Sequence, residues 1–373
     1  MTNWTRLGIV GGGQLAVMTA EAARPLGIEV VALASSRDDP VHRVVPGTIV
    51  GDSHDVRDLR RLAALCDGLT FDHELVDPVT LALLEDEGVA LRPGATAMAV
   101  AVDKHRQLRL FRSAGLPVPE TVVVHSVHEA IAAAESFGPA VLKSATGGYD
   151  GRGVLIDPGP DAIRSWFPRR RATVLVQPRL AIEAELAVQV VRGVDGEIVV
   201  YPAVRTVQDD GMCAVVHVPS GLPPGLESEA ASIARTVAEA IGVVGVLAVE
   251  FLVVDGAIVL NELAARPHNS GHVTLESSRT SQFENHVRAV VGLPLGATDL
   301  VVPAAAMANV IGNVAVAGGL GPSSDDVAVH LYGKTPRPGR KLGHVTSIAD
   351  STELAVERAI RAARDLEQGV LAS

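Results

Sequence analysis

Aromatic residues, cysteines and long hydrophobic runs are scarce in this sequence of 373 residues. Aromatic side chains make up only 3% of it, so its core must be built from alanine, valine, leucine and isoleucine. The two cysteines, Cys66 and Cys213, are too few for a disulfide framework or a four-ligand zinc site, and we expect both to be small buried apolar residues. No apolar run approaches the ~20 residues of a membrane span, and residues 1–10 lack the basic segment of a signal peptide. We therefore expect a cytoplasmic protein that does not contact a membrane.

Positive charge is scarce as well. The 32 Lys and Arg residues are outnumbered by 43 Asp and Glu residues, which gives a net charge of −11. This balance argues against a nucleic-acid-binding protein, which needs a broad basic surface, but it leaves room for a nucleotide site with a few local cations. With 47% hydrophobic and 20% charged residues, the composition is that of a folded protein, and its length suits two or three domains.

Strand and helix patterns divide the chain into three parts. Residues 1–95 alternate between the two patterns, which predicts a doubly wound parallel sheet. The predicted strands of this part are 7–10, 29–34, 47–50 and 68–71. The middle of the chain, up to residue 298, combines helices with strands of more antiparallel character. It includes helices over 96–115 and 226–241, the second of which should stop at Gly242, and a strand over 197–204. The last part is β-rich and closed by a helix over 351–367. The predicted fold class is therefore α/β.

A glycine-rich turn follows the first predicted strand. Gly11, Gly13 and Ala16 fit the spacing of a dinucleotide-binding loop. Asp38 and Asp39 lie beyond the second strand, and this combination by itself favours an NAD(P)-dependent oxidoreductase. Glycine N–H groups at a helix N-terminus bind any phosphate, however, so we interpret the turn as a phosphate-binding loop whose ligand is not specified. A tight turn without a ligand is the simpler alternative.

Two glutamates stand in the strands of a predicted β-hairpin in the middle of the chain. A three-residue loop would make Glu250 and Glu262 diagonal neighbours on one face, about 7–8 Å apart, with Asn261 on the other face. Carboxylates in apolar strands are costly unless a cation binds them, and oxygen ligands suit Mg²⁺ held together with phosphates. Exposure of both glutamates to solvent is the alternative.

A glycine-rich loop follows Lys143, which ends a predicted strand. Four glycines lie within residues 147–153, which predicts a flexible lid that closes over phosphates and excludes water. A simple hairpin turn is the alternative, since Asp-Gly is a common turn signal. Lys104 lies in the first turn of a helix for which Asp103 is the predicted N-cap, and a lysine at such a position is usually solvated.

Polar residues follow the hairpin, from Arg266 through His268 and Asn269 to His272. A guanidinium group can hold a small anion with two parallel N–H donors, so we expect Arg266 to form an anion clamp. We expect His272 to be a cap or a hydrogen-bonded core residue. Further on, the basic turn over 332–341 is as compatible with a surface turn as with a phosphate site.

Together these segments resemble the ATP-grasp superfamily and, within it, the N5-carboxyaminoimidazole ribonucleotide synthase family. The matching segments span nearly the whole chain and are 11–15, 71–74, 103–104, 147–153, 261–264, 266–272, 281–284 and 337–344. The tyrosine-bearing glycine loop and the His–Asn–Ser–Gly–His run are the most specific of them. Gln177 stands where the family usually has the glutamate that binds the adenine amino group.

The resemblance implies a three-domain α/β enzyme of the ATP-grasp fold that forms a homodimer. Its parts would be a Rossmann-like domain (1–95), an ATP-grasp domain (96–298, with a lid at roughly 118–180) and a β-rich C-terminal module (299–373). The substrates would be ATP, bicarbonate and 5-aminoimidazole ribonucleotide, and the metal Mg²⁺, with Mn²⁺ as an alternative. Bicarbonate would attack the γ-phosphate to give carboxyphosphate, whose carboxyl group the substrate amine captures, with ADP and phosphate released in a step of purine biosynthesis.

The resemblance also implies a role for each matching residue. ATP would be bound by Lys104, Lys143, Gly147, Gly148, Gly151, Gln177 and Glu185, and the metal by Glu250 and Glu262. The catalytic residues, which handle bicarbonate and carboxyphosphate, would be Arg266, His268 and Asn269. Among these, His268 is expected to take up the proton of the attacking amine. The ribonucleotide would be bound by Gln14, Leu15, Glu74, Tyr149, Asp150, Arg152, Lys334 and Arg340.

Other functions fit parts of the sequence. The nearest is a formate-dependent glycinamide ribonucleotide transformylase, another purine ATP-grasp enzyme. An NAD(P)-dependent oxidoreductase would leave the hairpin glutamates and the glycine loop without a role. A nucleotide-binding regulatory protein without catalysis would fit the departures from the family pattern at Ala145, Gln177 and Ala265.

Overall fold

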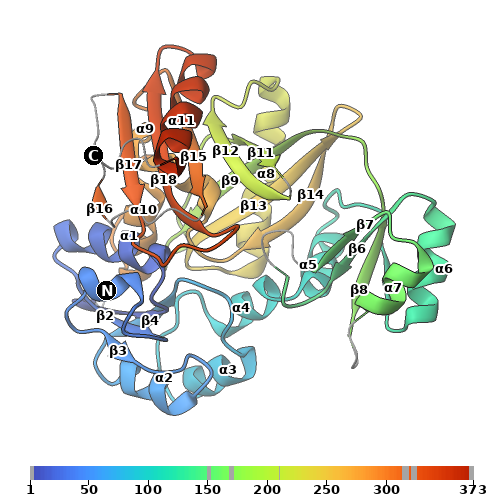
Figure 1. The fold of residues 1–373 in the computed structure, drawn as a ribbon. Coiled ribbons are helices and arrows are strands. Elements are labelled where there is room, and N and C mark those ends of the chain that lie inside the picture. The colour runs from blue at the N-terminus through green and yellow to red at the C-terminus, as the bar shows by residue number, and fades with distance from the viewer. Residues whose placement is uncertain are drawn as a thin grey trace.

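The computed structural model describes residues 4–148, 153–167, 172–209, 211–312, 319–320 and 326–368. Within these ranges, three sheets organise the chain (Figure 1). The first is a four-stranded sheet in the N-terminal part, the second a four-stranded sheet that projects to one side, and the third a ten-stranded sheet through the middle and C-terminal parts. This mixed α/β architecture confirms the predicted fold class.

The N-terminal sheet is parallel, as predicted, with the order β3-β2-β1-β4. Its strands are β1 (Arg6–Val10), β2 (Glu29–Ala34), β3 (Ile49–Val50) and β4 (Gly68–Phe71). Alternate side chains of a strand point to opposite faces of the sheet, and because both faces are apolar, helices cover each of them. One face packs on α2 (Val56–Ala63) and α3 (Pro78–Asp86), and the other on α1 (Gln14–Ala23) and α10 (Gln282–Val291). Because α10 comes from the middle of the chain, this packing joins the N-terminal sheet to the central part.

The projecting sheet is antiparallel and has the order β5-β8-β6-β7 (Figure 1). Its strands are β5 (Val122–Val124), β6 (Ala140–Ser144), β7 (Val154–Ile156) and β8 (Val174–Pro178). Two helices, α6 (Val127–Phe137) and α7 (Pro160–Trp166), pack their apolar side chains on it. Ser126 and Glu129 start α6 with a reciprocal capping box, which satisfies backbone donors that the first turn leaves unpaired.

The large sheet, called the central sheet below, is apolar on one face and carries polar residues among further apolar ones on the other. At one end of it lie β14 (Ala257–Ala264), which is the edge strand, then β13 (Gly245–Val254) and β9 (Ile182–Arg192). The even-numbered residues of β9 and the odd-numbered residues of β13 pack against α8 (Pro224–Ile241), which ends at Gly242 in a left-handed conformation, as predicted. The opposite face therefore carries Glu185, Gln189 and Glu250, which come from two neighbouring strands.

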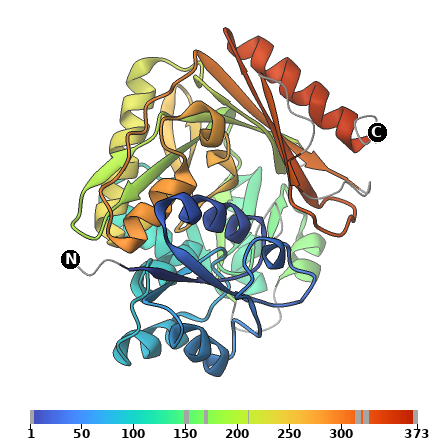
Figure 2. The same ribbon diagram turned by 90° about the vertical axis from the view of Figure 1, so that its left-hand side faces the viewer.

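The C-terminal strands continue this large sheet. β12 (Met212–Val218) pairs with β15 (Ala304–Ile311), which pairs in turn with β18 (Lys341–Ala349) and, beyond it, β17 (Val327–Leu331). The helix α11 (Thr352–Glu367) lies along these strands (Figure 2). A residue on β15 can therefore reach the central site across the same sheet. The domain boundaries given above stay predictions.

Some elements differ from the predictions. The helix expected over 96–115 is broken into α4 (Ala95–Ala101) and α5 (Lys104–Ser113), with Asp103 as the predicted N-cap of α5. The strand expected over 197–204 stops at residue 200, and a proline at 202, which has no N–H to donate to a ladder, precedes β11 (Val204–Asp209). Both cysteines are half-buried instead of buried. None of the helices in the described parts is long and apolar enough to cross a membrane.

Candidate active site

The hairpin of β13 and β14 has a different register from the predicted one. Its turn is formed by two residues, Asp255 (φ 50°) and Gly256 (φ 71°), instead of three. Two successive left-handed residues give a turn whose twist matches that of the strands, which favours this shorter loop. A β-bulge after Glu250 then places Glu262 directly opposite Glu250, instead of diagonally. The two carboxylates are therefore closer neighbours than the sequence predicted.

The same bulge brings Asn261 into the site, whereas the prediction placed its side chain on the other face of the hairpin. Phe251 pairs with Leu260 and Glu250 pairs with Glu262, so Asn261 is the extra residue of the bulged strand. Its Oδ1 atom accepts a hydrogen bond of 2.8 Å from Nζ of Lys143. Because this lysine lies on β6, the bond connects the projecting sheet to the central one.

Lys104 forms an ion pair with Glu262, and both side chains are partly buried. The start of α5 is held in place by the backbone N–H of Lys104, which donates to the carbonyl of Ala145 at 2.8 Å. One turn later, the Gln107 amide accepts from the N–H of Leu263 (3.1 Å) and donates to its carbonyl (3.3 Å). A lysine in the first turn of a helix is usually solvated, but the side chain of Lys104 is directed towards the glutamates of the hairpin.

Lys143 lies in a crowded field of charges. Burial lowers the pKa of Lys143 to about 8, the charge of Lys104 adds to that effect, and Glu250 and Glu185 oppose it. Burial raises the pKa of Glu185, whose carboxylate also accepts a hydrogen bond of 3.0 Å from Gln208. Two lysines close enough to repel each other are well placed to share an anion, because a bound phosphate group would offset their repulsion.

Glu250 and Glu262 fit a magnesium ion that is shared with phosphates. Burial raises the pKa of Glu250, which a bound cation would reverse. Within the part of the chain that the structure describes, no three His, Cys, Asp or Glu side chains converge on a point that could hold a metal. Two carboxylates without further protein ligands are typical of Mg²⁺, which keeps water and substrate oxygens in its other positions.

Arg266 joins the central part to the N-terminal domain. Its Nε atom donates to Oε2 of Glu74 at 2.7 Å, and its Nη1 atom donates to the carbonyl of Pro267 at 3.1 Å. Glu74 follows β4, and the side chains of this ion pair are 22% and 16% exposed, so the pair is partly screened from water. The bonds fix the plane of the guanidinium group beside Glu250. Burial raises the pKa of Glu250, and the charge of Arg266 opposes that shift.

His268 and Asn269 lie next to this cation. The Nε2 atom of His268 is 3.4 Å from Oε1 of Glu250. Burial lowers the pKa of His268 to about 3, assisted by the charges of Arg266 and Lys341, so its imidazole is neutral at pH 7. The amide of Asn269 forms two reciprocal hydrogen bonds with that of Asn309, at 2.9 and 2.8 Å. Asn309 lies on β15, so a C-terminal strand orients the polar run.

The glycine turn of the N-terminal domain is occupied by a carboxylate of the protein itself. The N–H of Gly13 donates to Oδ2 of Asp72 at 2.8 Å, and a Cβ atom on Gly11 (φ 124°) would overlap with the same carboxylate. This bond occupies the Gly13 N–H that a bound phosphate would use, and burial raises the pKa of Asp72. At Gly13 the turn therefore binds a carboxyl group of the protein, which removes the support for the oxidoreductase alternative. A phosphate-binding role for the rest of the turn stays a prediction.

The ribonucleotide-binding residues predicted from the sequence are brought together only in part. Nζ of Lys334 donates to Oε1 of Gln14, which connects the C-terminal basic turn to α1. Leu15 is buried against Phe283, whereas Arg340 donates to the carbonyl of Thr335 at 3.0 Å within the basic turn. Four predicted residues, Tyr149, Asp150, Gly151 and Arg152, lie outside the described residues.

The residues of the projecting sheet that are predicted to bind ATP lie on its strands and in the loops that follow them. Gln177, on β8, is buried and donates a hydrogen bond of 3.0 Å to Thr121. Gly147 and Gly148 follow β6, and Gly147 adopts the left-handed conformation (φ 76°) that favours glycine.

Sequence reasoning missed several residues of the site. Asp72 stood in a matching segment without a role, and Lys341 stood in the basic turn, where Arg340 was chosen instead. Burial raises the pKa of Glu250 and lowers that of His268; the charge of Lys341 opposes the first shift and adds to the second, which places Lys341 near both side chains. No sequence pattern linked Asn309 to the site, because it lies in an apolar strand that is distant in sequence from Arg266 and His268.

His272 is a core residue, as predicted. It is buried, its Nδ1 atom lies 3.1 Å from Nε2 of Gln282, and its ring packs against Phe283 and His344. Because Gln282 also bonds to the backbone of His268, His272 packs beside the start of the polar run.

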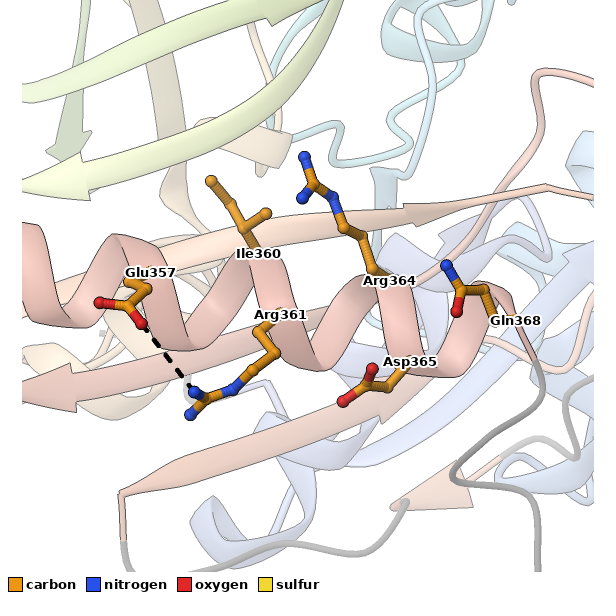
Figure 3. Close-up of a pocket in the computed structure, with 6 residues that line it drawn as sticks. All are labelled: Glu357, Ile360, Arg361, Arg364, Asp365 and Gln368. Atoms are coloured by element: carbon orange, nitrogen blue, oxygen red, sulfur yellow. Dashed lines mark ion pairs between the residues drawn. The ribbon is translucent and has the colours of Figure 1, made fainter.

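A shallow hollow on α11 is separate from this site. The residues around it are Glu357, Ile360, Arg361, Arg364, Asp365 and Gln368 (Figure 3). Glu357 and Arg361 form an ion pair of 3.9 Å across it. The helix covers the face of the sheet that carries Ala308, whereas Asn309 points to the opposite face.

Comparisons with known proteins match this geometry over nearly the whole chain. Three family models match: the ribonucleotide synthetase preATP-grasp domain (residues 4–102), the ATP-grasp domain (109–283) and the phosphoribosylaminoimidazole carboxylase C-terminal domain (305–358). An N5-carboxyaminoimidazole ribonucleotide synthase of Mycobacterium tuberculosis is 42% identical over 97% of this chain and 87% of its own.

Solved structures agree with the sequence comparison. The ADP complex of an N5-carboxyaminoimidazole ribonucleotide synthetase superposes with a TM-score of 0.89 and 31% identity, covering 99% of this chain and 100% of the other. The synthase of Aspergillus clavatus, in complex with ADP and 5-aminoimidazole ribonucleotide, superposes with a TM-score of 0.86 and 30% identity over 99% and 100% of the two chains.

Proposed function

The chain belongs to the N5-carboxyaminoimidazole ribonucleotide synthase family, and we propose which of its residues carry out the family's reaction. The enzyme is an ATP-dependent ligase of purine biosynthesis that carboxylates 5-aminoimidazole ribonucleotide. The observation that carries the assignment of residues is the meeting of two lysines, two paired glutamates and the Arg266 run at one place on the central sheet.

ATP would lie between the projecting sheet and the central one. Lys104 and Lys143 would bind its phosphates, and Glu185 with Gln177 would hold the nucleoside end, together with Gly147, Gly148 and Gly151. The ion pair between Lys104 and Glu262 and the bond between Lys143 and Asn261 keep both ammonium groups directed at the hairpin. Phosphoryl transfer depends mostly on such positioning and on charge neutralisation.

Glu250 and Glu262 would hold Mg²⁺, or Mn²⁺ in its place, against the triphosphate. When bound, the metal supplies positive charge to the phosphate oxygens. The residues of the protein contribute the geometry: direct pairing across the bulge fixes the two carboxylates relative to each other, and Lys104 balances their charge before the nucleotide arrives.

Arg266, His268 and Asn269 would bind bicarbonate and then carboxyphosphate. Glu74 holds the guanidinium group of Arg266, and the amide of Asn309 holds that of Asn269, so both donors are oriented before the anion binds. Preorganised donors stabilise developing negative charge more than mobile ones, and burial strengthens the effect. The neighbouring sheet would also keep water from the reactive mixed anhydride.

The ribonucleotide would bind between the N-terminal domain and the basic turn. Gln14, Leu15, Glu74, Lys334 and Arg340 would contact it, with Tyr149, Asp150 and Arg152 from the glycine loop. The bond between Lys334 and Gln14 already brings the two sides together. We also propose, from the family resemblance, that the enzyme acts in the cytoplasm as a homodimer, which sedimentation at micromolar concentration would test.

The release of ADP tests this function. We expect release to require 5-aminoimidazole ribonucleotide and to rise with added bicarbonate. A parallel reaction with glycinamide ribonucleotide and formate serves as the control for the related transformylase activity. ADP release that is independent of the aminoimidazole ribonucleotide, or faster with the control pair, would overturn the proposal.

A further inference from the structure

The Nδ1 atom of His268 is held by a residue two positions further along the chain. The backbone N–H of Ser270 donates to it at 3.4 Å, and the hydroxyl oxygen of Ser270 lies 2.8 Å from it. A backbone N–H group can only donate, so Nδ1 is an acceptor and carries no hydrogen. In a neutral imidazole, the hydrogen is then on Nε2.

Gln189 supports the same tautomer through Ser270. Its Nε2 atom donates to the hydroxyl oxygen of Ser270 at 2.8 Å, which occupies a lone pair of that oxygen. The hydroxyl hydrogen is therefore left to donate to Nδ1 of His268. Gln189 is fully buried on β9 and Ser270 is 1% exposed, so water does not compete for either bond.

The backbone of His268 is fixed as well. The buried side chain of Gln282 accepts from the N–H of His268 at 3.0 Å and donates to its carbonyl at 2.8 Å. With the backbone and Nδ1 both held, the Nε2 atom is directed at the site, 3.4 Å from Oε1 of Glu250. A carboxylate oxygen accepts hydrogen bonds, which agrees with a hydrogen on Nε2.

We propose that Ser270 and Gln189 are positioning residues that hold His268 as its Nε2–H tautomer, so that His268 donates a hydrogen bond to the bound oxyanion. This inference rests on the proposed function for the identity of that anion. It replaces the expectation that His268 takes up the proton of the amine, because neither ring nitrogen has an available lone pair: Nε2 carries the hydrogen and Nδ1 already accepts from Ser270.

The tautomer can be measured directly by ¹⁵N NMR of the free enzyme with labelled histidine. Protonated and bare imidazole nitrogens resonate far apart, and a His268→Asn variant assigns the signals. We expect wild-type His268 to carry its hydrogen on Nε2. A hydrogen on Nδ1 would overturn the inference, and would leave the proposed function intact, because the measurement needs no substrate and no turnover.

Ser270→Ala tests the effect on the reaction. It removes the hydroxyl donor and leaves only the long backbone bond, so we expect a mixture of tautomers and a loss of about tenfold in kcat, with KM for ATP unchanged within about twofold. Ser277→Ala is the matched control, since Ser277 is also fully buried but its hydroxyl has no partner among the described residues. We expect that variant to keep both tautomer and rate.

Two further variants separate positioning from simple stability. Ser270→Thr keeps the hydroxyl and should restore the Nε2–H tautomer together with most of kcat. Gln189→Met keeps the length of the side chain but removes its donor, and should shift the tautomer in the direction of Ser270→Ala. A loss of kcat in Ser270→Ala without any change in tautomer would overturn the positioning role.

Discussion

Replacing Arg266 by lysine changes the proposed anion site while keeping its charge. In the structure the Nε atom of Arg266 donates to Glu74 at 2.7 Å, which leaves the plane of the guanidinium group fixed. A lysine has one ammonium group on a flexible stem, and it cannot hold Glu74 and also present parallel N–H donors to a planar anion. The partly buried Glu74 carboxylate would compete with bicarbonate for that ammonium.

The expected loss follows from the role of a preorganised donor. Removal of one donor from an oxyanion site typically lowers kcat by about 10²–10³, equivalent to about 2.7–4 kcal/mol of transition-state stabilisation. We expect Arg266→Lys to lose that much in the rate of bicarbonate-dependent ADP release. KM for ATP should change little, because the two lysines that bind phosphate are unaltered.

A matched control separates this effect from the loss of an ion pair. Arg288 donates from Nε to Glu284 at 2.8 Å with similar exposure, but it lies on α10, where we assign no contact with substrate. Arg288→Lys should keep kcat within about twofold. If Arg266→Lys retained more than a third of the wild-type rate, or if the control lost as much, the assignment of Arg266 to the anion would be refuted.

Other predictions concern the metal pair, the start of α5 and the pH dependence. Glu262→Gln should keep the melting temperature within a few degrees but lose most of the turnover, and a near-normal rate at saturating Mg²⁺ would remove Glu262 from the metal site. Gln107→Leu leaves the backbone N–H and carbonyl of Leu263 unpaired, so we expect urea unfolding to show a loss of about 1–3 kcal/mol. Burial lowers the pKa of Lys143 to about 8, so the charged form is lost as pH rises through that value, and kcat/KM for ATP should fall. Lys143→Arg, which stays charged, should abolish that fall; a profile that does not change would contradict the role of Lys143.

Much of the fold follows from local patterns in the sequence. The apolar runs of β1, β2 and β4, separated by helices, predict a parallel sheet because such strands are covered on both faces. Asp103 and Gly242 mark helix ends by their own chemistry, and both were predicted correctly.

The site was harder to predict, because it depends on single-residue shifts and on distant contacts. The bulge after Glu250 has no sequence signal of its own, yet it moves Glu262 opposite Glu250 and brings Asn261 to Lys143. The carboxylate of Asp72 comes from another strand to occupy the glycine turn, which local glycine spacing cannot reveal. The family resemblance implied roles for Glu250, Glu262 and Lys143, but it indicated neither the bulge nor the position of Asp72.

The fate of labelled bicarbonate tests the central claim most directly. With ¹³C-bicarbonate, ATP and 5-aminoimidazole ribonucleotide, we expect ¹³C NMR to show one new carbamate signal that grows in step with ADP, one carbon for each ADP released. ADP release without any labelled carbamate would contradict the account.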